Sequence, residues 1–139
     1  MKYLLDTCVI SELAKPVPEK KVLNWFNGIP SEALLLSVVT IGEIRKGLTK
    51  LADSKRKDSL AVWLNTLLED YRARILAIDL AVADNWGQIQ GNAEMAGAPM
   101  STLDGLIAAT AYTHNLTVVT RNENDFNKAR VPILNPWNK

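Results

Sequence analysis

Residues 3–13 read YLLDTCVISEL, an apolar run that ends on a carboxylate at Asp6 and continues into a helical pattern. Apolar runs of this length are typical of a strand that is buried on both faces, and such strands belong to parallel sheets. Asp6 then marks the carboxyl end of a first strand over residues 3–5, where parallel sheets bind their ligands. Asp6 is open to two interpretations, as a cap of the following helix or as one wall of a metal site.

The rest of the chain repeats this alternation of strand and helix. Further strands are predicted over residues 34–39, 75–78 and 117–120, with a fifth edge strand over 133–134. Helices are predicted over residues 9–14, 20–26, 41–51, 60–71, 82–95 and 103–114. The pattern predicts an α/β fold, a central and mainly parallel twisted sheet of four to five strands covered by helices on both faces. Residues 41–51 and 60–71 form a helical hairpin in this interpretation.

Composition limits the class of protein. The chain has 139 residues, of which 47% are hydrophobic, which suits a single domain over residues 1–139. Its 16 Lys and Arg nearly balance its 15 Asp and Glu, so nucleic acid would have to be bound by locally clustered charge. One cysteine, no signal peptide and no membrane-length apolar run predict a soluble cytoplasmic protein.

Acids recur where the predicted strands end. They are Asp6, Glu43, Asp79, Asp104 and Asp125. Each has a structural alternative, because Thr40-x-x-Glu43 and Ser101-x-x-Asp104 resemble capping boxes and Asp79 precedes a helix as an N-cap would. We expect Asp79 to be such a cap.

Taken together, the other acids favour a cation site. The helix that follows Asp104 (GLIAATA) is so apolar that it must be buried, which brings its first turn against the sheet. Several carboxylates in a partly buried cleft are costly unless a cation compensates their charge. Oxygen ligands select Mg²⁺, for which Mn²⁺ can substitute, whereas one His and one Cys cannot build a usual zinc site.

Four stretches carry a family resemblance: YLLDTCVISEL, LLLSVVTIGEIRKGL, DGLIAATAYTHNLTVVTRNENDF and the closing VPILNPW. In this order and spacing the chain resembles PIN-domain ribonucleases, of the kind that act as the toxin in VapBC-like toxin–antitoxin pairs. The resemblance covers essentially the whole chain. It implies a PIN-like three-layer α/β/α sandwich.

The resemblance also implies a site. Its catalytic acids correspond to Asp6, Glu43, Asp104 and Asp125, and its supporting polar residues to Thr7, Thr120 and Asn122. Asp6, Asp104 and Asp125 would hold the metal, with Asn122 as a rival to Asp125, and Glu43 would act through water or a second metal. The implied activity is endoribonuclease hydrolysis of RNA by a metal-activated water. This scheme needs no histidine, and His114 is expected to be a C-terminal helix-dipole partner.

Partners follow from charge and from the family. Arg45, Lys46 and Arg121 are the candidate RNA phosphate contacts, and the KRK run at 55–57 is either a basic hairpin tip or a solvated turn. Trp137 could stack on a base, whereas the other three tryptophans are expected in the core or an interface. An acidic cleft also suits a cognate antitoxin that inserts a basic side chain. The family implies a homodimer and a hetero-oligomer with the antitoxin.

Two alternatives stay open at this point. The first is a PIN-fold protein-binding module without activity, whose acids merely cap helices. The second is an aspartyl-phosphate-type phosphohydrolase, which needs another acid two residues after Asp6, where this chain has Cys8.

Overall fold

The computed structural model describes residues 1–139. Its sheet has five strands in the order β3-β2-β1-β4-β5, and all neighbouring strands are parallel. The strands are β1 (Tyr3–Leu5), β2 (Leu34–Ser37), β3 (Ile75–Leu76), β4 (Thr117–Val119) and β5 (Ile133–Leu134). The predicted parallel sheet is confirmed, and so is its edge strand β5.

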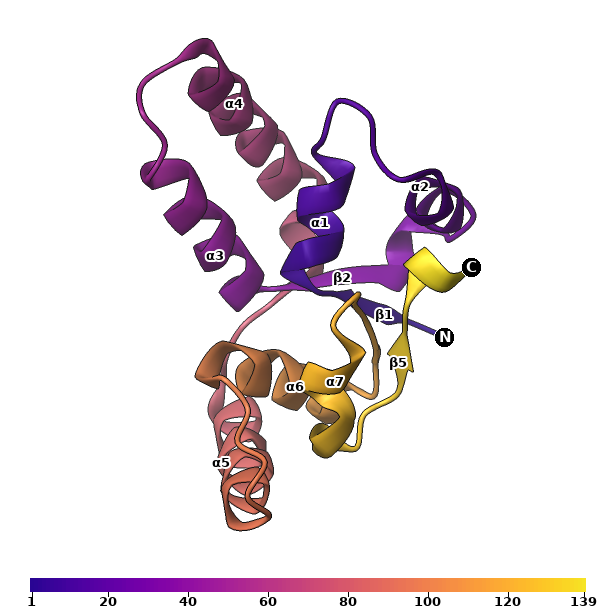
Figure 1. Ribbon diagram of the computed structural model, residues 1–139, viewed down its shortest axis with the longest axis vertical. Helices are drawn as coiled ribbons and strands as arrows, with labels where there is room; N and C mark the ends of the chain where they lie inside the picture. The colour runs from indigo at the N-terminus through magenta and orange to yellow at the C-terminus, as the bar shows by residue number, and fades with distance from the viewer.

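Seven α-helices flank this sheet. They are α1 (Thr7–Leu13), α2 (Lys20–Asn27), α3 (Val38–Thr49), α4 (Lys55–Asp70), α5 (Leu80–Met95), α6 (Thr102–His114) and α7 (Glu123–Phe126). Helices α1 to α4 lie on one side of the sheet and α5 to α7 on the other, which is the predicted three-layer arrangement (Figure 1). The predicted helical hairpin is formed by α3 and α4. No helix combines the length and the apolar character needed to cross a membrane.

The core explains why the strands lack an alternating pattern. Leu4 and Val118 are fully buried in one apolar cluster, shared with α6. The next residue of each strand, Leu5 and Val119, is fully buried in the cluster on the opposite face. Because successive side chains of a strand point to opposite faces, a sheet covered on both sides needs apolar residues at every position.

The boundary between β2 and α3 differs from the sequence prediction. Strand β2 ends at Ser37 rather than at residue 39, and α3 begins at Val38 rather than at residue 41. The cause is Ser37, whose buried hydroxyl accepts a hydrogen bond from the Val39 N–H at 3.0 Å and caps the helix. The capping box at Thr40 is therefore wrong, because Thr40 lies inside α3.

The basic run at 55–57 is helical, whereas the sequence places it before the helix. Helix α4 begins at Lys55, five residues earlier than predicted, and the Ser54 hydroxyl accepts from the Lys57 N–H at 3.1 Å. The run is thus the first turn of α4, at the end of the hairpin where the loop from α3 joins it. The cap at Asp79 is confirmed, since its carboxylate accepts from the Val82 N–H at 3.0 Å at the start of α5.

Candidate functional site

The three central strands bring the predicted acids to one edge of the sheet. β1 lies between β2 and β4, and each of the three ends beside a segment that carries an acid. Asp6 follows β1 directly, Glu43 lies on α3 after β2, and Asp125 lies on α7 after β4. Asp104 reaches the same place from the first turn of α6. We call these four residues the acid cluster.

Asp6 is the most enclosed member of the acid cluster, with 5% of its surface exposed. One carboxylate oxygen accepts from the Thr7 N–H at 2.8 Å, and the other accepts from the Thr120 hydroxyl at 2.8 Å. A usual N-cap bonds to the second or third N–H of its helix, whereas Asp6 bonds to the first. Asp6 thus stands at the cap position of α1, but its orientation is set from the neighbouring strand as well.

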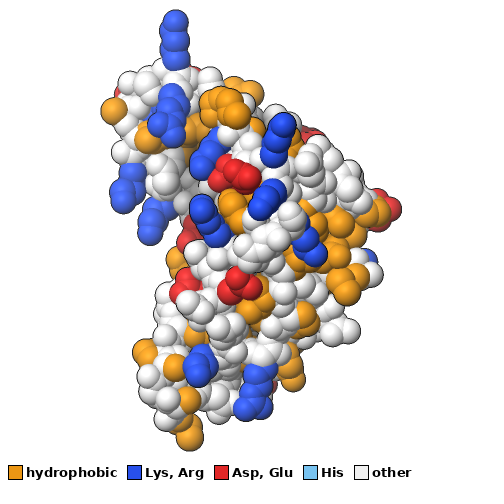
Figure 2. All heavy atoms as spheres, turned by 45° about the vertical axis from the view of Figure 1, so that its right-hand side comes forward, with side chains coloured by type: hydrophobic (Ala, Val, Ile, Leu, Met, Phe, Trp, Pro, Cys, Tyr) orange, Lys and Arg blue, Asp and Glu red, His pale blue; other side chains and the backbone are white.

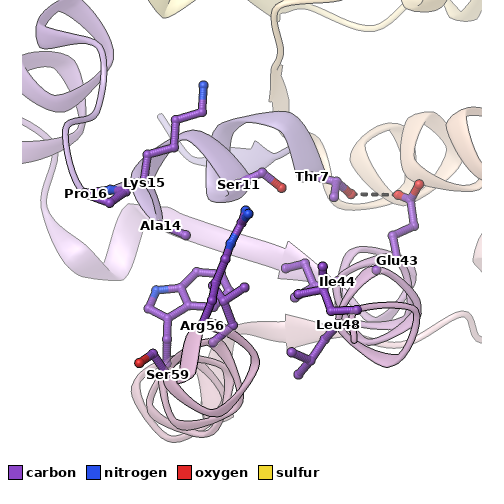
Figure 3. Close-up of a pocket in the computed structure, with 14 residues that line it drawn as sticks. Thr7, Ser11, Ala14, Lys15, Pro16, Glu43, Ile44, Leu48, Arg56 and Ser59 are labelled. Atoms are coloured by element: carbon purple, nitrogen blue, oxygen red, sulfur yellow. Dashed lines mark hydrogen bonds between the residues drawn. The ribbon is translucent and has the colours of Figure 1, made fainter. Parts of the chain in front are cut away.

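Thr7 joins Asp6 to Glu43. While its N–H donates to Asp6, its hydroxyl donates to Glu43 Oε1 at 2.6 Å and lies 3.3 Å from the Thr40 hydroxyl (Figure 3). Glu43 sits one turn beyond Thr40 on α3 and is half-buried. One threonine at the start of α1 therefore fixes the carboxylates of two different elements.

Asp104 shows that the four acids interact. Ser101, and not Asp104, caps α6, because the Ser101 hydroxyl accepts from the Asp104 N–H at 3.2 Å. Burial raises the pKa of the Asp104 carboxyl above its ordinary value, a hydrogen bond with the Ser101 side chain lowers it, and three neighbouring carboxylates raise it further. Those neighbours, in order of effect, are Asp6, Asp125 and Glu43.

No basic side chain compensates this negative charge. The ion pairs of the protein lie elsewhere, and none of them includes a member of the acid cluster. As placed, no three Asp, Glu, His or Cys side chains form a preassembled metal cage, so an ion would have to draw the carboxylates closer together. The donor set still fits a hard divalent cation, because it offers only carboxylate oxygens, partly buried and mutually repelling.

The other predicted residues are mostly exposed. Asp125, the fourth member of the acid cluster, is exposed, as is Asn122, whose N–H donates to the Thr120 hydroxyl at 3.0 Å. Arg45 and Lys46 are exposed on α3, beyond Glu43. Arg121 is exposed next to Thr120, and its N–H donates to the Cys8 sulfur at 3.5 Å. Asp79, by contrast, has only its capping role.

The Cys8 side chain lies against Asp6 and is a protonated thiol. Its sulfur donates to Asp6 Oδ2 at 3.5 Å. Burial, and after it the negative charge of Asp6, raises the pKa of this thiol to about 11. Cys8 is therefore neither a nucleophile nor the second acid that an aspartyl-phosphate mechanism requires.

Sequence reasoning missed the support beneath Asp104. The Gln90 amide on α5 donates to the Met100 carbonyl at 2.7 Å, just before the cap of α6. Gln90 Oε1 and the Trp86 indole nitrogen are buried without hydrogen-bond partners. A Cβ at Gly105, the residue after Asp104, would lie 2.4 Å from Gln90 Oε1 and 3.0 Å from Trp86 Nε1. The only signal in the sequence was this glycine inside an apolar helix.

A largely apolar groove of about 790 Å³ begins at the acid cluster and runs between α1, α3 and α4. Thr7 and Glu43 lie at one end of this groove, and Ile44 and Leu48 form its α3 wall (Figure 3). Arg56 reaches from α4 towards Ser11 on α1. Figure 2 shows Lys and Arg side chains gathered in the upper half of one face, around an acidic group, with further acidic side chains below them and a few basic ones at the lower end.

Comparisons with known proteins agree on one family. The PIN domain family matches residues 3–132 of this chain. The chain is 40% identical over 135 residues to Toxin FitB of Neisseria gonorrhoeae, which covers 96% of this chain and 97% of FitB. It is 36% identical over 138 residues to VapC ribonuclease Y4jK of Sinorhizobium fredii, covering 96% of each. The crystal structure of FitAcB from Neisseria gonorrhoeae superposes with a TM-score of 0.93 at 39% identity, over 99% of both chains.

Proposed function

Because this chain belongs to the PIN domain family, we propose that it is a Mg²⁺-dependent endoribonuclease, with Mn²⁺ able to substitute, that acts as the toxin of a toxin–antitoxin pair in the cytoplasm. Relatives named as ribonucleases and endonucleases support the class of reaction. The observation that carries the proposal is that β1, β2, β4 and the first turn of α6 bring four carboxylates to one edge of the sheet, where burial and, to a lesser extent, the other three acids raise the pKa of Asp104.

Asp6, Asp104 and Asp125 would hold the cation. Asp6 is suited to this because Thr7 and Thr120 hold its two oxygens from opposite sides. Asp104 is suited because no basic side chain offsets its repulsion by the other carboxylates. Asp125 is the most exposed of the three, and Asn122 is its nearest alternative.

When bound, the cation would neutralise a phosphate oxygen of RNA and make a water molecule more acidic. Glu43 would take the proton from that water. Its Oε1 is occupied by the Thr7 hydroxyl, so Oε2 is the atom left to accept the proton. Thr120 holds Asp6 in place during the reaction, and Arg45, Lys46 and Arg121 would contact RNA phosphates.

The partner of such a toxin would be a cognate antitoxin. The similar structures of FitAcB and of FitAB support an antitoxin partner, and we expect the toxin itself to be a homodimer within that hetero-oligomer. The groove between α1, α3 and α4 suits an antitoxin segment, because it is largely apolar and opens at the acid cluster. A basic side chain at the end of that segment would pair with the uncompensated carboxylates.

An RNA cleavage assay tests the proposal. The wild-type protein should cut single-stranded RNA in Mg²⁺ or Mn²⁺ and not in EDTA. Asp6→Asn and Asp104→Asn should lose most of the activity while remaining folded, whereas Asp79→Asn, a matched change at a confirmed cap, should keep it. Cleavage that is unchanged in EDTA, or equal in Asp104→Asn and Asp79→Asn, would refute the proposal.

A further inference from the structure

A second hollow lies beside the acid cluster. It has a volume of about 540 Å³ and is bounded on one side by the segment from Lys15 to Lys20 and on the other by Arg121 and Trp137. Arg121 also lines a smaller hollow of about 300 Å³ that contains Asp125. The two spaces therefore share one side chain, and we call the larger one the Trp137 hollow.

The Trp137 hollow combines a fixed cation with an aromatic ring. The Arg121 guanidinium carbon lies 5.2 Å from the centre of the Trp137 ring, which restrains the guanidinium by a cation–π contact. Trp137 itself is half-buried against the core cluster that contains Leu5, so it is a firm support. Arg121 is exposed and makes no ion pair. Its planar group is thus available to stack on a base and to bind a phosphate.

The opposite wall is held in shape by a buried carboxylate. Glu12 is 7% exposed, accepts from Lys15 Nζ at 2.9 Å, and accepts from the Glu19 N–H at 2.9 Å. These two hydrogen bonds, the one from Lys15 first, lower the pKa of Glu12, so it stays ionised at neutral pH. Glu12 thereby neutralises Lys15 and fixes the loop between α1 and α2. The same wall carries Glu19 and Lys20, neither of which makes an ion pair.

We propose that the Trp137 hollow binds one nucleotide of a single-stranded RNA next to the bond that is cut, with its base stacked on Arg121 and a phosphate near Arg121 and Lys20. This inference rests on the proposed function for the identity of the cut bond. A nucleotide fits better than a peptide, because the hollow is polar and presents a planar cation backed by an aromatic ring. Single-stranded RNA is required, because a base in a duplex has no free face.

Binding of a labelled single-stranded oligoribonucleotide, measured in EDTA where the proposed nuclease cannot act, tests the inference. Arg121→Gln should weaken binding about tenfold and reduce the slope of log K against log salt by about 0.7. Arg121→Lys should keep the salt slope but lose affinity, because an ammonium cannot stack. Trp137→Phe should bind like the wild type, and Trp137→Leu should not. Lys128→Gln, an exposed cation outside both hollows, is the control.

Several outcomes would overturn this inference. They are unchanged affinity in Arg121→Gln, equal losses in Arg121→Gln and Lys128→Gln, and equal weakening by Trp137→Phe and Trp137→Leu. Melting temperatures of all variants separate a local loss of binding from unfolding. The two proposals fail differently. RNA that is bound through Arg121 but never cut would refute the nuclease alone, and RNA that is cut by Arg121→Gln with unchanged KM and affinity would refute the subsite alone.

Discussion

Replacing Gly105 with Ala should destabilise the protein, although alanine favours a helix. The new Cβ would lie 2.4 Å from Gln90 Oε1 and 3.0 Å from Trp86 Nε1, so one of these side chains has to move. Gln90 cannot swing away freely, because its amide donates to the Met100 carbonyl at 2.7 Å. Overpacking costs about 1–3 kcal/mol, and loss of that hydrogen bond costs about 1 kcal/mol.

The higher helix propensity of alanine offsets about 1 kcal/mol of this cost, so the net loss should be about 1–3 kcal/mol. Gly87→Ala is the matched control, since a Cβ there meets nothing within 4 Å. It should stabilise the protein by about 0.5–1 kcal/mol. Urea unfolding followed by circular dichroism measures both values.

The argument also predicts coupling between Gly105 and Gln90. Gln90→Ala removes the atom closest to the new methyl group, so the double variant should be more stable than the sum of the two single changes allows. Because Asp104 precedes Gly105, RNA cleavage by Gly105→Ala should fall as well. A Gly105→Ala protein as stable as Gly87→Ala, or strict additivity with Gln90→Ala, would refute this account of the α5–α6 contact.

Three further predictions concern the acid cluster and the side chains that contact it. Without metal, Asp104→Asn should be at least as stable as the wild type at neutral pH. The pKa of Asp104 is higher in the folded than in the unfolded protein, so this carboxyl stabilises the fold at low pH, and that contribution is lost as the pH rises from the unfolded pKa through the folded pKa. Lower stability of this variant in EDTA would instead indicate a structural role for the carboxylate. Thr7→Val removes the donor to Glu43 and should reduce cleavage by about 10–100-fold, while Thr7→Ser keeps most activity; equal rates in the two variants would contradict the role of that hydroxyl. At about pH 8, Cys8 should be alkylated on the order of 100-fold more slowly than an ordinary thiol, because its pKa is about 11; fast alkylation in the folded protein would show that its thiolate is accessible.

The sheet could be predicted because a strand that is buried on both faces needs an apolar residue at every position, and such continuous apolar runs are visible in the sequence. Leu4 and Leu5 are consecutive and both fully buried, as expected of a short strand that lies between two layers. The boundary at residues 37–38 could not be predicted, because Val38 and Val39 suit a strand as well as a helix. The side chain of Ser37 decides between them by capping α3.

The four acids could be found because each follows a strand or opens a helix, and these positions meet at one edge of a parallel sheet. Their electrostatic interaction could not be read from the sequence, since it depends on how deeply each helix is buried. The support of Asp104 by Gln90 depends on the docking of α5 against α6. The cation–π contact of Arg121 with Trp137 depends on the chain end packing beside α2.

The central claim is that the acid cluster binds a divalent cation, and thermal unfolding with and without Mg²⁺ at neutral pH tests it most directly. The melting temperature of the wild type should rise with Mg²⁺, by the equivalent of about 2.7 kcal/mol at a hundred times the dissociation constant. Asp79→Asn should respond equally and Asp104→Asn far less. The response of the wild type should shrink near pH 4, where protons compete for the carboxylates. The claim would be contradicted if Mg²⁺ did not change the melting temperature of the wild type, or if Mg²⁺ raised the melting temperature of Asp104→Asn as much as that of Asp79→Asn.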